Sequence, residues 1–258
     1  MELLLNGDCV EKIKELPNNS VDMVLMDPPY GTTTCEWDKA LNFNILWPEI
    51  ERVTKEQSAI CIFGTEPFST SLRESNKKLY KYDWYWKKCK SLGANFCHSK
   101  NSPIKIIENI CVFSKAKINH IGKTKNRMTY NPQGLIECKP VKCGHKHVKA
   151  STFGKYLERR PSHKKYERTL TGYPSNVLDI GFESKERKNR QHPAQKPLAL
   201  LEYLIKTYTN EGDTVLDLTM GSGSTGVAAR KTGRNFVGIE LSEYYFDVAI
   251  KRIGEGVT

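Results

Sequence analysis

The stretch from Asp213 to Leu241, DTVLDLTMGSGSTGVAARKTGRNFVGIEL, constrains the fold more than any other part of the chain. It reads as an apolar strand, a glycine-rich turn, a helix of small residues and a second apolar strand. A glycine turn between a strand and a helix is typical of units in which parallel strands alternate with helices. The stretch therefore predicts an α/β fold with a mostly parallel sheet covered by helices on both faces.

Segments elsewhere in the chain continue this alternation of strands and helices. Apolar or β-branched runs predict strands over residues 1–5, 21–26, 58–64, 79–88 and 108–115. Apolar residues at helical spacing predict helices over residues 8–16, 40–54, 68–75, 192–209 and 242–253. The helix predicted from His192 has a proline, Pro193, at its start, and Ser242 is the expected N-cap of the last helix. Between residues 115 and 190 no regular pattern is found, and an irregular insertion is expected there.

The positive charge of the chain is concentrated in that irregular segment. The formal net charge is +11, and residues 115–190 hold 19 Lys and Arg against 6 Asp and Glu, while the remainder has a balance of −2. A localised basic region is typical of proteins that bind nucleic acids, because neutralised phosphates release counterions. A solvated, loop-rich insertion is the alternative interpretation of the same charge.

Cysteine usage and hydropathy limit the classes of protein that the chain can belong to. The eight cysteines are scattered without a C-x-x-C pair, which favours free thiols. No apolar run approaches the roughly 18 to 20 residues needed to cross a bilayer, and the N-terminus lacks the basic start of a signal peptide. We expect a cytoplasmic protein without a membrane partner. A zinc site is the less favoured interpretation of one basic loop, since its spacing is unlike that of common fingers; its residues are Cys138, Cys143, His145 and His147.

The glycine turn predicts a cofactor site. Gly221, Gly223 and Gly226 match G-x-G-x-x-G, and Glu240 ends the next strand 19 residues after the first glycine. This pattern suits a nucleotide whose ribose hydroxyls bind an acid, as in nicotinamide, flavin and S-adenosylmethionine sites. Asp217 favours S-adenosylmethionine, because a carboxylate beside the cofactor suits an ammonium group and repels a pyrophosphate.

Three motifs in one order resemble a known family. They are DPPY at 27–30, HPAQKP at 192–197 and DLTMGSGSTG at 217–226, with the basic segment between the first two. Their order resembles that of the beta class of DNA amino-methyltransferases, which move a methyl group from S-adenosylmethionine to an exocyclic amine of a base. The resemblance covers nearly the whole chain. It implies the Rossmann-like fold of S-adenosylmethionine-dependent methyltransferases, with a permuted motif order and a target-recognition insertion.

The resemblance assigns the catalytic role to the DPPY turn. The exocyclic amine is a poor nucleophile, because its lone pair is delocalised into the ring. The Asp27 carboxylate and the Pro28 carbonyl are expected to accept its N–H groups, with Pro28 and Pro29 fixing the turn. Tyr30 is expected to stack on the flipped base.

The resemblance also predicts residues that bind the cofactor and the DNA. Asp8 and Cys9 are expected at the cofactor adenine, Lys196 and Pro197 at the methionine carboxylate, and Glu240 at the ribose. The remaining predicted cofactor residues are Asp27, Asp217, Gly221, Gly223, Ser224, Thr225 and Leu241. Predicted residues of the base pocket or the DNA contact are Phe63, Trp86, Lys87, Arg127, Lys142, Lys146, Arg159 and Arg160, although a packed core is the favoured interpretation of Phe63 and Trp86.

The expected organisation is one methyltransferase domain over residues 1–258. Its catalytic half would span 1–114, its target-recognition insertion 115–190 and its cofactor half 191–258. Double-stranded DNA is the expected partner, a homodimer and a cognate restriction endonuclease are further candidates, and no resident metal is expected.

Four alternatives stay open. Aspartate at position 27 resembles the adenine-specific enzymes, whereas a cytosine-N4 enzyme more often has serine there. RNA and protein methyltransferases usually have asparagine at that position and place the cofactor motif first. A DNA-binding module without activity is a third possibility. A nicotinamide dehydrogenase is the fourth, and it leaves DPPY and HPAQKP unexplained.

Overall fold

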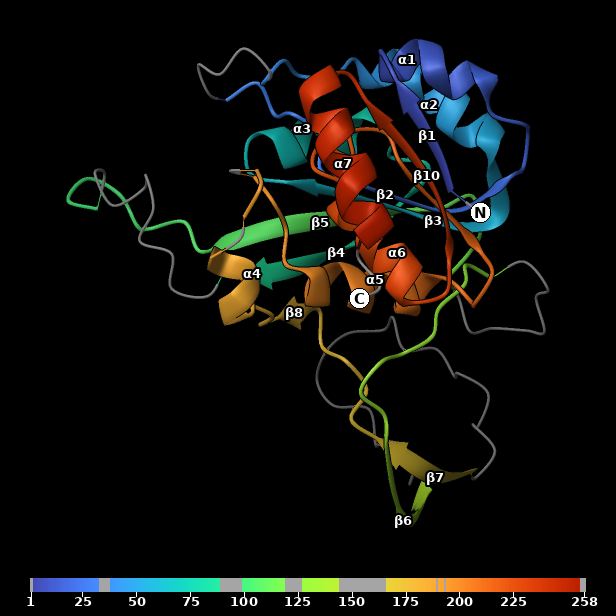
Figure 1. Ribbon diagram of the computed structural model, residues 1–258. Helices are drawn as coiled ribbons and strands as arrows, with labels where there is room; N and C mark the ends of the chain where they lie inside the picture. Colours follow the sequence, from blue (N-terminus) through green and yellow to red (C-terminus); the bar gives the residue numbers. More distant parts are fainter. Residues whose placement is uncertain are drawn as a thin grey trace. The chain divides into compact units, whose positions relative to one another are not determined.

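The fold is built around an eight-stranded sheet (Figure 1). The computed structural model describes residues 2–32, 38–88, 99–118, 127–143, 166–188, 190–192 and 194–255. The strand order is β1-β10-β9-β2-β3-β5-β4-β8. The strands of this sheet are β1 (Glu2–Asn6), β2 (Val21–Met26), β3 (Thr54–Gly64), β4 (Tyr80–Lys87), β5 (Ile107–Phe113), β8 (Val177–Leu178), β9 (Thr214–Asp217) and β10 (Asn235–Glu240).

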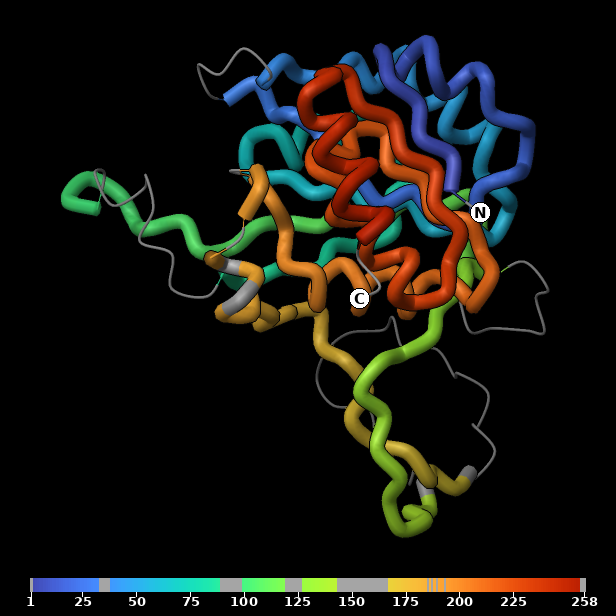
Figure 2. Tube along the Cα trace, in the orientation of Figure 1, coloured from blue at the N-terminus to red at the C-terminus, as the bar shows by residue number. Residues whose placement is uncertain are grey.

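The sheet is mostly parallel. All neighbours from β1 to β3 are parallel, whereas β5 runs antiparallel to both β3 and β4, and β8 runs parallel to β4. The two ends of the chain meet in this sheet, since Leu4 in β1 is registered with Gly238 in β10, and Figure 2 shows these two segments side by side. The predicted mixed, mostly parallel sheet is therefore confirmed.

Helices cover both faces of the sheet. They are α1 (Cys9–Lys12), the 3-10 turn η1 (Ile13–Glu15), α2 (Phe43–Val53), α3 (Phe68–Ser75), α4 (Ser184–Lys188), α5 (Leu198–Tyr208), α6 (Ser224–Lys231) and α7 (Glu243–Glu255). One core cluster joins the strands to residues of α5, α6 and α7, and a second joins them to residues of α1, η1, α2 and α3. Successive side chains of β2 alternate between the clusters: Met23 and Leu25 belong to the first, Val24 and Met26 to the second. This is the predicted three-layer α/β architecture.

A smaller unit, residues 132–174, is separate from the unit formed by residues 1–131 and 175–258. It holds β6 (Ile136–Cys143) and β7 (Tyr166–Thr171), which pair antiparallel. No strand was predicted here from the sequence, because the residues of β6 include two lysines and Pro140, which are not typical of a strand. The pairing register shifts between Glu137 and Val141, which is where the proline lies, as expected for a residue that cannot donate to the ladder.

The described cysteines, helices and metal-binding residue types bear on the expected thiols, membrane segments and metal sites. Cys9, Cys61, Cys111 and Cys138 are free thiols. Among the described residues no helix has the length and apolar character to cross a membrane, and no cluster of His, Cys, Asp and Glu could hold a metal ion. Cys138 is described, but His145 and His147 lie outside the described residues.

Candidate active site

A cavity of about 1210 Å³ opens at the carboxyl ends of the parallel strands. The strands β1, β10, β9 and β2 are consecutive neighbours in the sheet, so the residues that follow them meet at one edge. Asp8, Glu240, Asp217 and Asp27 come from these four strand ends, and all four line the cavity. Ligands of open α/β sheets bind at this kind of crevice.

The turn after β2 is fixed by a buried carboxylate. Pro28 and Pro29 restrict φ and lack N–H groups. Asp38 is 7% exposed and accepts three main-chain hydrogen bonds, from the N–H of Tyr30 at 2.8 Å, of Gly31 at 2.9 Å and of Thr32 at 2.9 Å. The turn therefore keeps its shape without help from a ligand. Asp38 was not among the residues predicted from the sequence, because a single acid eight residues after Tyr30 forms no recognisable pattern with the motif.

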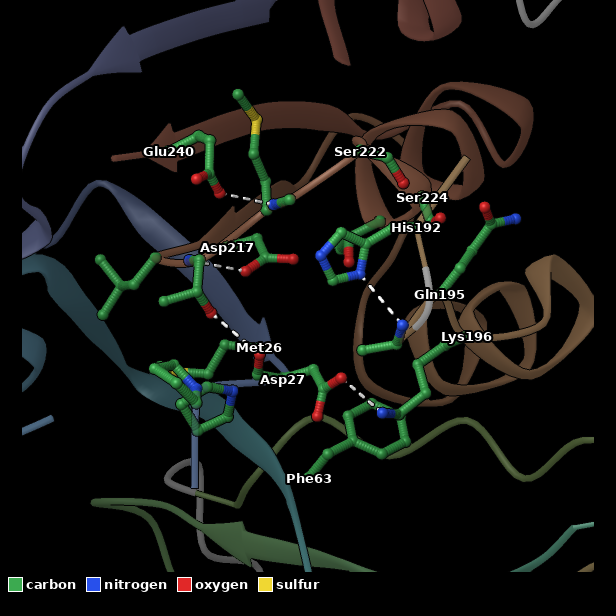
Figure 3. Close-up of a pocket in the computed structure, with 18 of the residues that line it drawn as sticks. Met26, Asp27, Phe63, His192, Gln195, Lys196, Asp217, Ser222, Ser224 and Glu240 are labelled. Carbon is green, nitrogen blue, oxygen red and sulfur yellow. Dashed lines mark hydrogen bonds and ion pairs between the residues drawn. The ribbon is translucent and has the colours of Figure 1, made fainter. Parts of the chain in front are cut away.

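Both carboxylate oxygens of Asp27 are hydrogen-bonded within the site. The Tyr30 hydroxyl donates to Oδ1 at 2.6 Å, and the Lys196 ammonium donates to Oδ2 (Figure 3). The Asp27 side chain is 23% exposed, and it faces the cavity. The Tyr30 ring stacks on Phe68 with 4.9 Å between centroids. Its predicted stacking on a flipped base stays a prediction.

Glu108 is a second carboxylate beside Lys196 and Tyr30, and it was not among the residues predicted from the sequence. It lines the cavity with its side chain 2% exposed, and its Oε1 lies 2.9 Å from the Lys196 ammonium and 3.1 Å from the Tyr30 hydroxyl. Its Oε2 lies 2.5 Å from the Lys88 ammonium. Because β5 is antiparallel to its neighbours, its first residues, rather than its last, reach the edge where the parallel strands end.

The two carboxylates have opposite pKa shifts. Burial raises the pKa of Asp27 above its ordinary value, the charge of Glu108 adds to this, and the nearby Lys196 opposes it. Burial would also raise the pKa of Glu108, but the ammonium groups of Lys196 and Lys88 lower it below the ordinary value. Lys196 is buried too, which lowers its pKa, yet its two carboxylate partners raise it overall. Lys196 therefore stays charged between the two acids.

The acid at the end of β10 organises the glycine turn. The Glu240 carboxylate accepts from the N–H of Gly221 at 2.9 Å (Figure 3). It also accepts from the N–H of Ser242 at 2.8 Å. Burial raises the pKa of Glu240, and these main-chain hydrogen bonds partly offset the rise. A carboxylate held in this way presents its remaining lone pairs to the cavity in a fixed orientation.

Asp217 is the last residue of β9, and it lines the cavity. Its side chain accepts from the N–H of Thr219 at 3.0 Å, and the residue is 3% exposed. Burial raises the pKa of Asp217 to about 7, against hydrogen bonds from Thr225 and Thr219 that lower it. A cationic group in the cavity would relieve the cost of ionising this acid.

The three glycines of the G-x-G-x-x-G match have different physical roles: Gly221 and Gly223 lie in the turn, and Gly226 lies in α6. Gly221 has φ of +52°, and a Cβ built there would meet no protein atom within 4 Å, so the backbone is exposed to the cavity. Gly223 has φ of +78° and immediately precedes α6. A Cβ on Gly226 would lie 2.5 Å from Ile253 and 2.7 Å from the Phe236 ring. The literal G-x-G-x-x-G match thus combines ligand access, turn geometry and helix packing.

The N-terminal turn contributes Asp8 and Cys9. Asp8 caps α1 by accepting from the N–H of Val10 at 2.8 Å, and the Gly7 N–H donates to the Glu240 main-chain oxygen at 2.9 Å. Burial raises the pKa of Cys9 to about 11, so its thiol is neutral. Both residues line the cavity, and their predicted contact with the cofactor adenine stays a prediction.

Most of the predicted site residues meet in this one cavity. Those that line it are Asp8, Cys9, Asp27, Pro28, Pro29, Tyr30, Phe63, Trp86, Lys196, Asp217, Gly221, Ser224, Thr225, Glu240 and Leu241. Phe63 and Trp86 also belong to a core cluster, and their predicted place in the base pocket stays a prediction. Lys196 was expected to face the methionine carboxylate of the cofactor, whereas its ammonium lies between two protein carboxylates.

Other predicted residues are not among those that line the cavity. Lys87 pairs with Asp179 at 2.8 Å, and the following residue, Lys88, lines the cavity instead. Lys142 is exposed on β6 in the smaller unit. Pro197, Gly223 and Arg127 are described but do not line the cavity, and Lys146, Arg159 and Arg160 lie outside the described residues.

Known sequences resemble the chain along its whole length. It is 29% identical to the type II methyltransferase M.HinfI of Haemophilus influenzae over 287 residues, which covers 99% of this chain and 69% of the relative. It is 26% identical to the DNA adenine methyltransferase YhdJ of Escherichia coli over 264 residues, covering 97% and 82% respectively.

Solved structures share the fold. The M1.HpyAVI–SAM complex matches with a TM-score of 0.61 at 24% identity, covering 98% of this chain and all of the other. The cytosine-N4-specific PvuII DNA methyltransferase matches with a TM-score of 0.65 at 17% identity, covering 97% and 86%. The model of the N6/N4 methyltransferase family, described as DNA methylase, matches residues 21–251. The chain therefore belongs to the N6/N4 DNA methylase family.

Proposed function

We propose that the chain transfers a methyl group from S-adenosylmethionine to the N6 amine of a flipped adenine in DNA. One observation carries the proposal. Asp27 and Asp217 follow β2 and β9, which are hydrogen-bonded neighbours, so an acceptor for the target amine and an acid suited to the cofactor face the same cavity. A methyl donor and its acceptor must meet within one cavity for direct transfer.

The residues of the cofactor half fit S-adenosylmethionine. Asp217 suits its α-ammonium group, because a cation lowers the cost of ionising a buried acid whose pKa is about 7. Glu240 is oriented to accept the ribose hydroxyls, and Gly221 allows the ligand to approach the backbone closely. When bound, S-adenosylmethionine supplies a methyl group on a positively charged sulfur, with a neutral thioether as the leaving group.

The catalytic half provides an acceptor for the amine. Asp27 accepts an N–H of the target amine, which localises the nitrogen lone pair for attack on the methyl carbon. As the new C–N bond forms, the C–S bond breaks and the sulfur keeps its electron pair. The methylated nitrogen is then positively charged and loses a proton, for which Asp27 is the nearest base in this proposal.

Adenine is the proposed base for two reasons. Asp27 opens the DPPY motif as in the adenine-specific enzymes that the sequence resembles, and one relative is named a DNA adenine methyltransferase. Cytosine-N4 transfer is the second candidate, since the PvuII enzyme of that specificity shares the fold at a TM-score of 0.65. The amine geometry that Asp27 must recognise is similar in the two bases.

DNA is the proposed macromolecular substrate, with the basic segment 115–190 as its recognition region. A second copy of the chain and a cognate restriction endonuclease are proposed partners, the latter because M.HinfI is a type II methyltransferase. We expect the protein to act in the cytoplasm.

The test is methyl transfer from labelled S-adenosylmethionine to unmethylated genomic DNA, followed by mass spectrometry of the nucleosides. We expect 6-methyladenine from the native chain and none from Asp27→Ala, while the variant still binds S-adenosylmethionine. A product containing 4-methylcytosine instead would select the second candidate. Cofactor binding without either methylated base would contradict DNA methylation.

A further inference from the structure

Asp27 and Glu108 share the same two hydrogen-bond donors. The Tyr30 hydroxyl lies 2.6 Å from Asp27 Oδ1 and 3.1 Å from Glu108 Oε1, but it carries a single proton and donates to one acid at a time. The Lys196 ammonium also contacts both acids, and it lies 2.9 Å from Glu108 Oε1. Any donor that moves toward Glu108 leaves a lone pair of Asp27 available.

The two acids that share these donors differ in their exposure to the cavity and in their other partners. Its side chain is 2% exposed, whereas that of Asp27 is 23% exposed and faces the cavity. Glu108 has Lys88 as an additional partner at 2.5 Å on its other oxygen. The site thus holds one acid that is fully enclosed by cations and one that is open to a ligand.

The proposed reaction requires Asp27 to change its partners. To accept an N–H of the target amine, Asp27 must offer a lone pair besides those that Tyr30 and Lys196 use, and each of these donors weakens the acceptor strength of the oxygen that it binds. To take the proton of the methylated amine, it must also be a sufficiently strong base. An acid held tightly by one lysine is a weak base, because the cation stabilises its ionised form.

We propose that Glu108 is a positioning residue for Asp27, which competes for Lys196 and the Tyr30 hydroxyl and so keeps Asp27 available and basic for the target amine. This inference rests on the proposed methyl transfer and adds a role that lies one contact away from the reacting atoms. Glu108 itself touches neither the amine nor the methyl group in this scheme. Its negative charge acts through Lys196 and Tyr30.

The sign of the effect follows from the charges around Asp27. The titratable groups around Asp27 and its partners include Tyr30 on its own turn, Glu108 at the start of β5, Lys88 after β4, His192 and Lys196 before α5, and Asp217 at the end of β9. Neutralising Glu108 removes a like charge near Asp27 and leaves Lys196 with one carboxylate. Both changes favour ionised Asp27, so its pKa falls.

The first test measures this pKa directly in the protein without ligand. The carboxyl carbons of aspartate are labelled with ¹³C, the signal of Asp27 is assigned by its loss in Asp27→Asn, and the pKa is followed in native and Glu108→Gln protein. We expect the pKa of Asp27 to fall by about one unit or more in Glu108→Gln. Lys196→Met should move it in the opposite direction. An unchanged Asp27 pKa in both variants would overturn the inference, whatever the substrate of the enzyme.

The second test measures catalysis. Glu108→Gln should lower kcat for methyl transfer about tenfold, shift the acidic limb of its pH profile to lower pH, and leave the Kd for S-adenosylmethionine unchanged. Glu108→Asp, which keeps the charge, should recover part of kcat and the native pH profile. A fall in kcat with an unshifted profile would assign Glu108 a purely structural role and contradict the inference.

A matched control uses Glu202→Gln on α5. Glu202 also contacts two lysines, Lys206 at 4.0 Å and Lys231 at 3.7 Å, but it does not line the cavity. Its substitution should change neither the Asp27 pKa nor the pH profile. If the native chain fails to methylate DNA, the proposed function fails while the first test still decides the relationship between Glu108 and Asp27.

Discussion

The hydroxyl of Thr219 donates a hydrogen bond to the main-chain oxygen of Asp27 at a distance of 3.2 Å. These residues are 192 positions apart in the sequence. One follows β9 in the cofactor half and the other follows β2 in the catalytic half, so a single side chain joins the two turns across adjacent strands. The relative position of methyl donor and acceptor thus depends partly on this contact.

Replacing Thr219 by valine should therefore reduce catalysis more than binding. Valine keeps the shape of threonine but cannot donate to Asp27, so the turn after β2 loses one of its fixed contacts. A small misplacement of reacting groups is costly in rate. We expect kcat for methyl transfer to fall about tenfold, while the Kd for S-adenosylmethionine measured by calorimetry stays within about twofold.

The control for this prediction is Thr70→Val on α3. The Thr70 hydroxyl donates to Glu66 at 2.6 Å on an exposed part of the helix, and it does not line the cavity. This variant should keep native kcat. Equal losses in the two variants, or a large loss of cofactor affinity in Thr219→Val, would refute the alignment role.

Cofactor affinity should rise with pH because of Asp217. Burial places the pKa of this acid at about 7 in the free protein, and in the proposed function its ionised form attracts the α-ammonium of S-adenosylmethionine. Below that pH, binding must first remove a proton from Asp217. We expect the Kd for S-adenosylmethionine to rise, by up to about tenfold for each unit that the pH falls below about 7, while the ammonium group of the ligand stays charged.

Calorimetry in two buffers of different ionisation enthalpy measures this proton release. Near pH 6 the native chain should release close to one proton on binding, and Asp217→Asn should release none from this position, with a weaker Kd that changes little with pH. Proton uptake on binding, or an identical pH dependence in Asp217→Asn, would assign the linkage to another group.

Gly221 in the turn and Gly226 in α6 should respond differently to substitution by alanine. At Gly226 an added Cβ would come within 2.5 Å of Ile253 and 2.7 Å of Phe236, so Gly226→Ala should lower the free energy of unfolding by about 1–3 kcal/mol through overpacking. At Gly221 the Cβ meets no protein atom, and the positive φ costs about 1 kcal/mol. There the methyl group extends toward the cavity, so cofactor affinity should fall more than stability does.

Thermal unfolding and cofactor titration of the two variants provide the comparison. The expected pattern is a larger drop in Tm for Gly226→Ala and a larger rise in Kd for Gly221→Ala. Gly212→Ala serves as the control for φ alone. Gly212 has φ of +81°, a Cβ built there would meet no atom within 4 Å, and the residue does not line the cavity. A Gly221→Ala variant that matches this control in Kd would show that the ligand lies elsewhere.

Sequence reasoning predicted those features of the site that depend on local turn chemistry. The DPPY turn and the glycine turn each follow an apolar strand directly, so Asp27, Asp217 and Gly221 could be placed at strand ends without knowing the sheet order. Once strands are parallel, their carboxyl ends share an edge, and the residues meet. The fold class could be predicted by the same argument.

The residues that were missed depend on pairing between distant segments. Glu108 reaches the cavity because β5 is inserted antiparallel between β3 and β4, and an apolar run such as ENICVF does not reveal its direction. Lys88 rather than Lys87 lines the cavity because neighbouring residues at the end of β4 differ in direction. Such positions are set by register, which the local sequence does not specify.

The lysines of β6 provide the last prediction, which concerns DNA. Lys139 and Lys142 are exposed on this strand in the smaller unit, within the segment that holds the positive charge of the chain. If they contact phosphates, each neutralised contact contributes to counterion release, so affinity falls with salt in proportion to their number. The double variant Lys139→Glu and Lys142→Glu should raise the Kd for duplex DNA and reduce the slope of log K against log salt by about two.

The matched control removes the same charge from the larger unit. Lys14 and Lys77 have exposed side chains that pair with neighbouring acids on α1 and α3, and Lys14→Glu with Lys77→Glu leaves the net charge equal to that of the β6 variant. Only the β6 variant should lose affinity and salt dependence, as measured by fluorescence anisotropy over a range of salt concentrations. If both double variants weaken binding equally, the attraction comes from net charge rather than from contacts of β6, and the recognition region must be sought elsewhere in the chain.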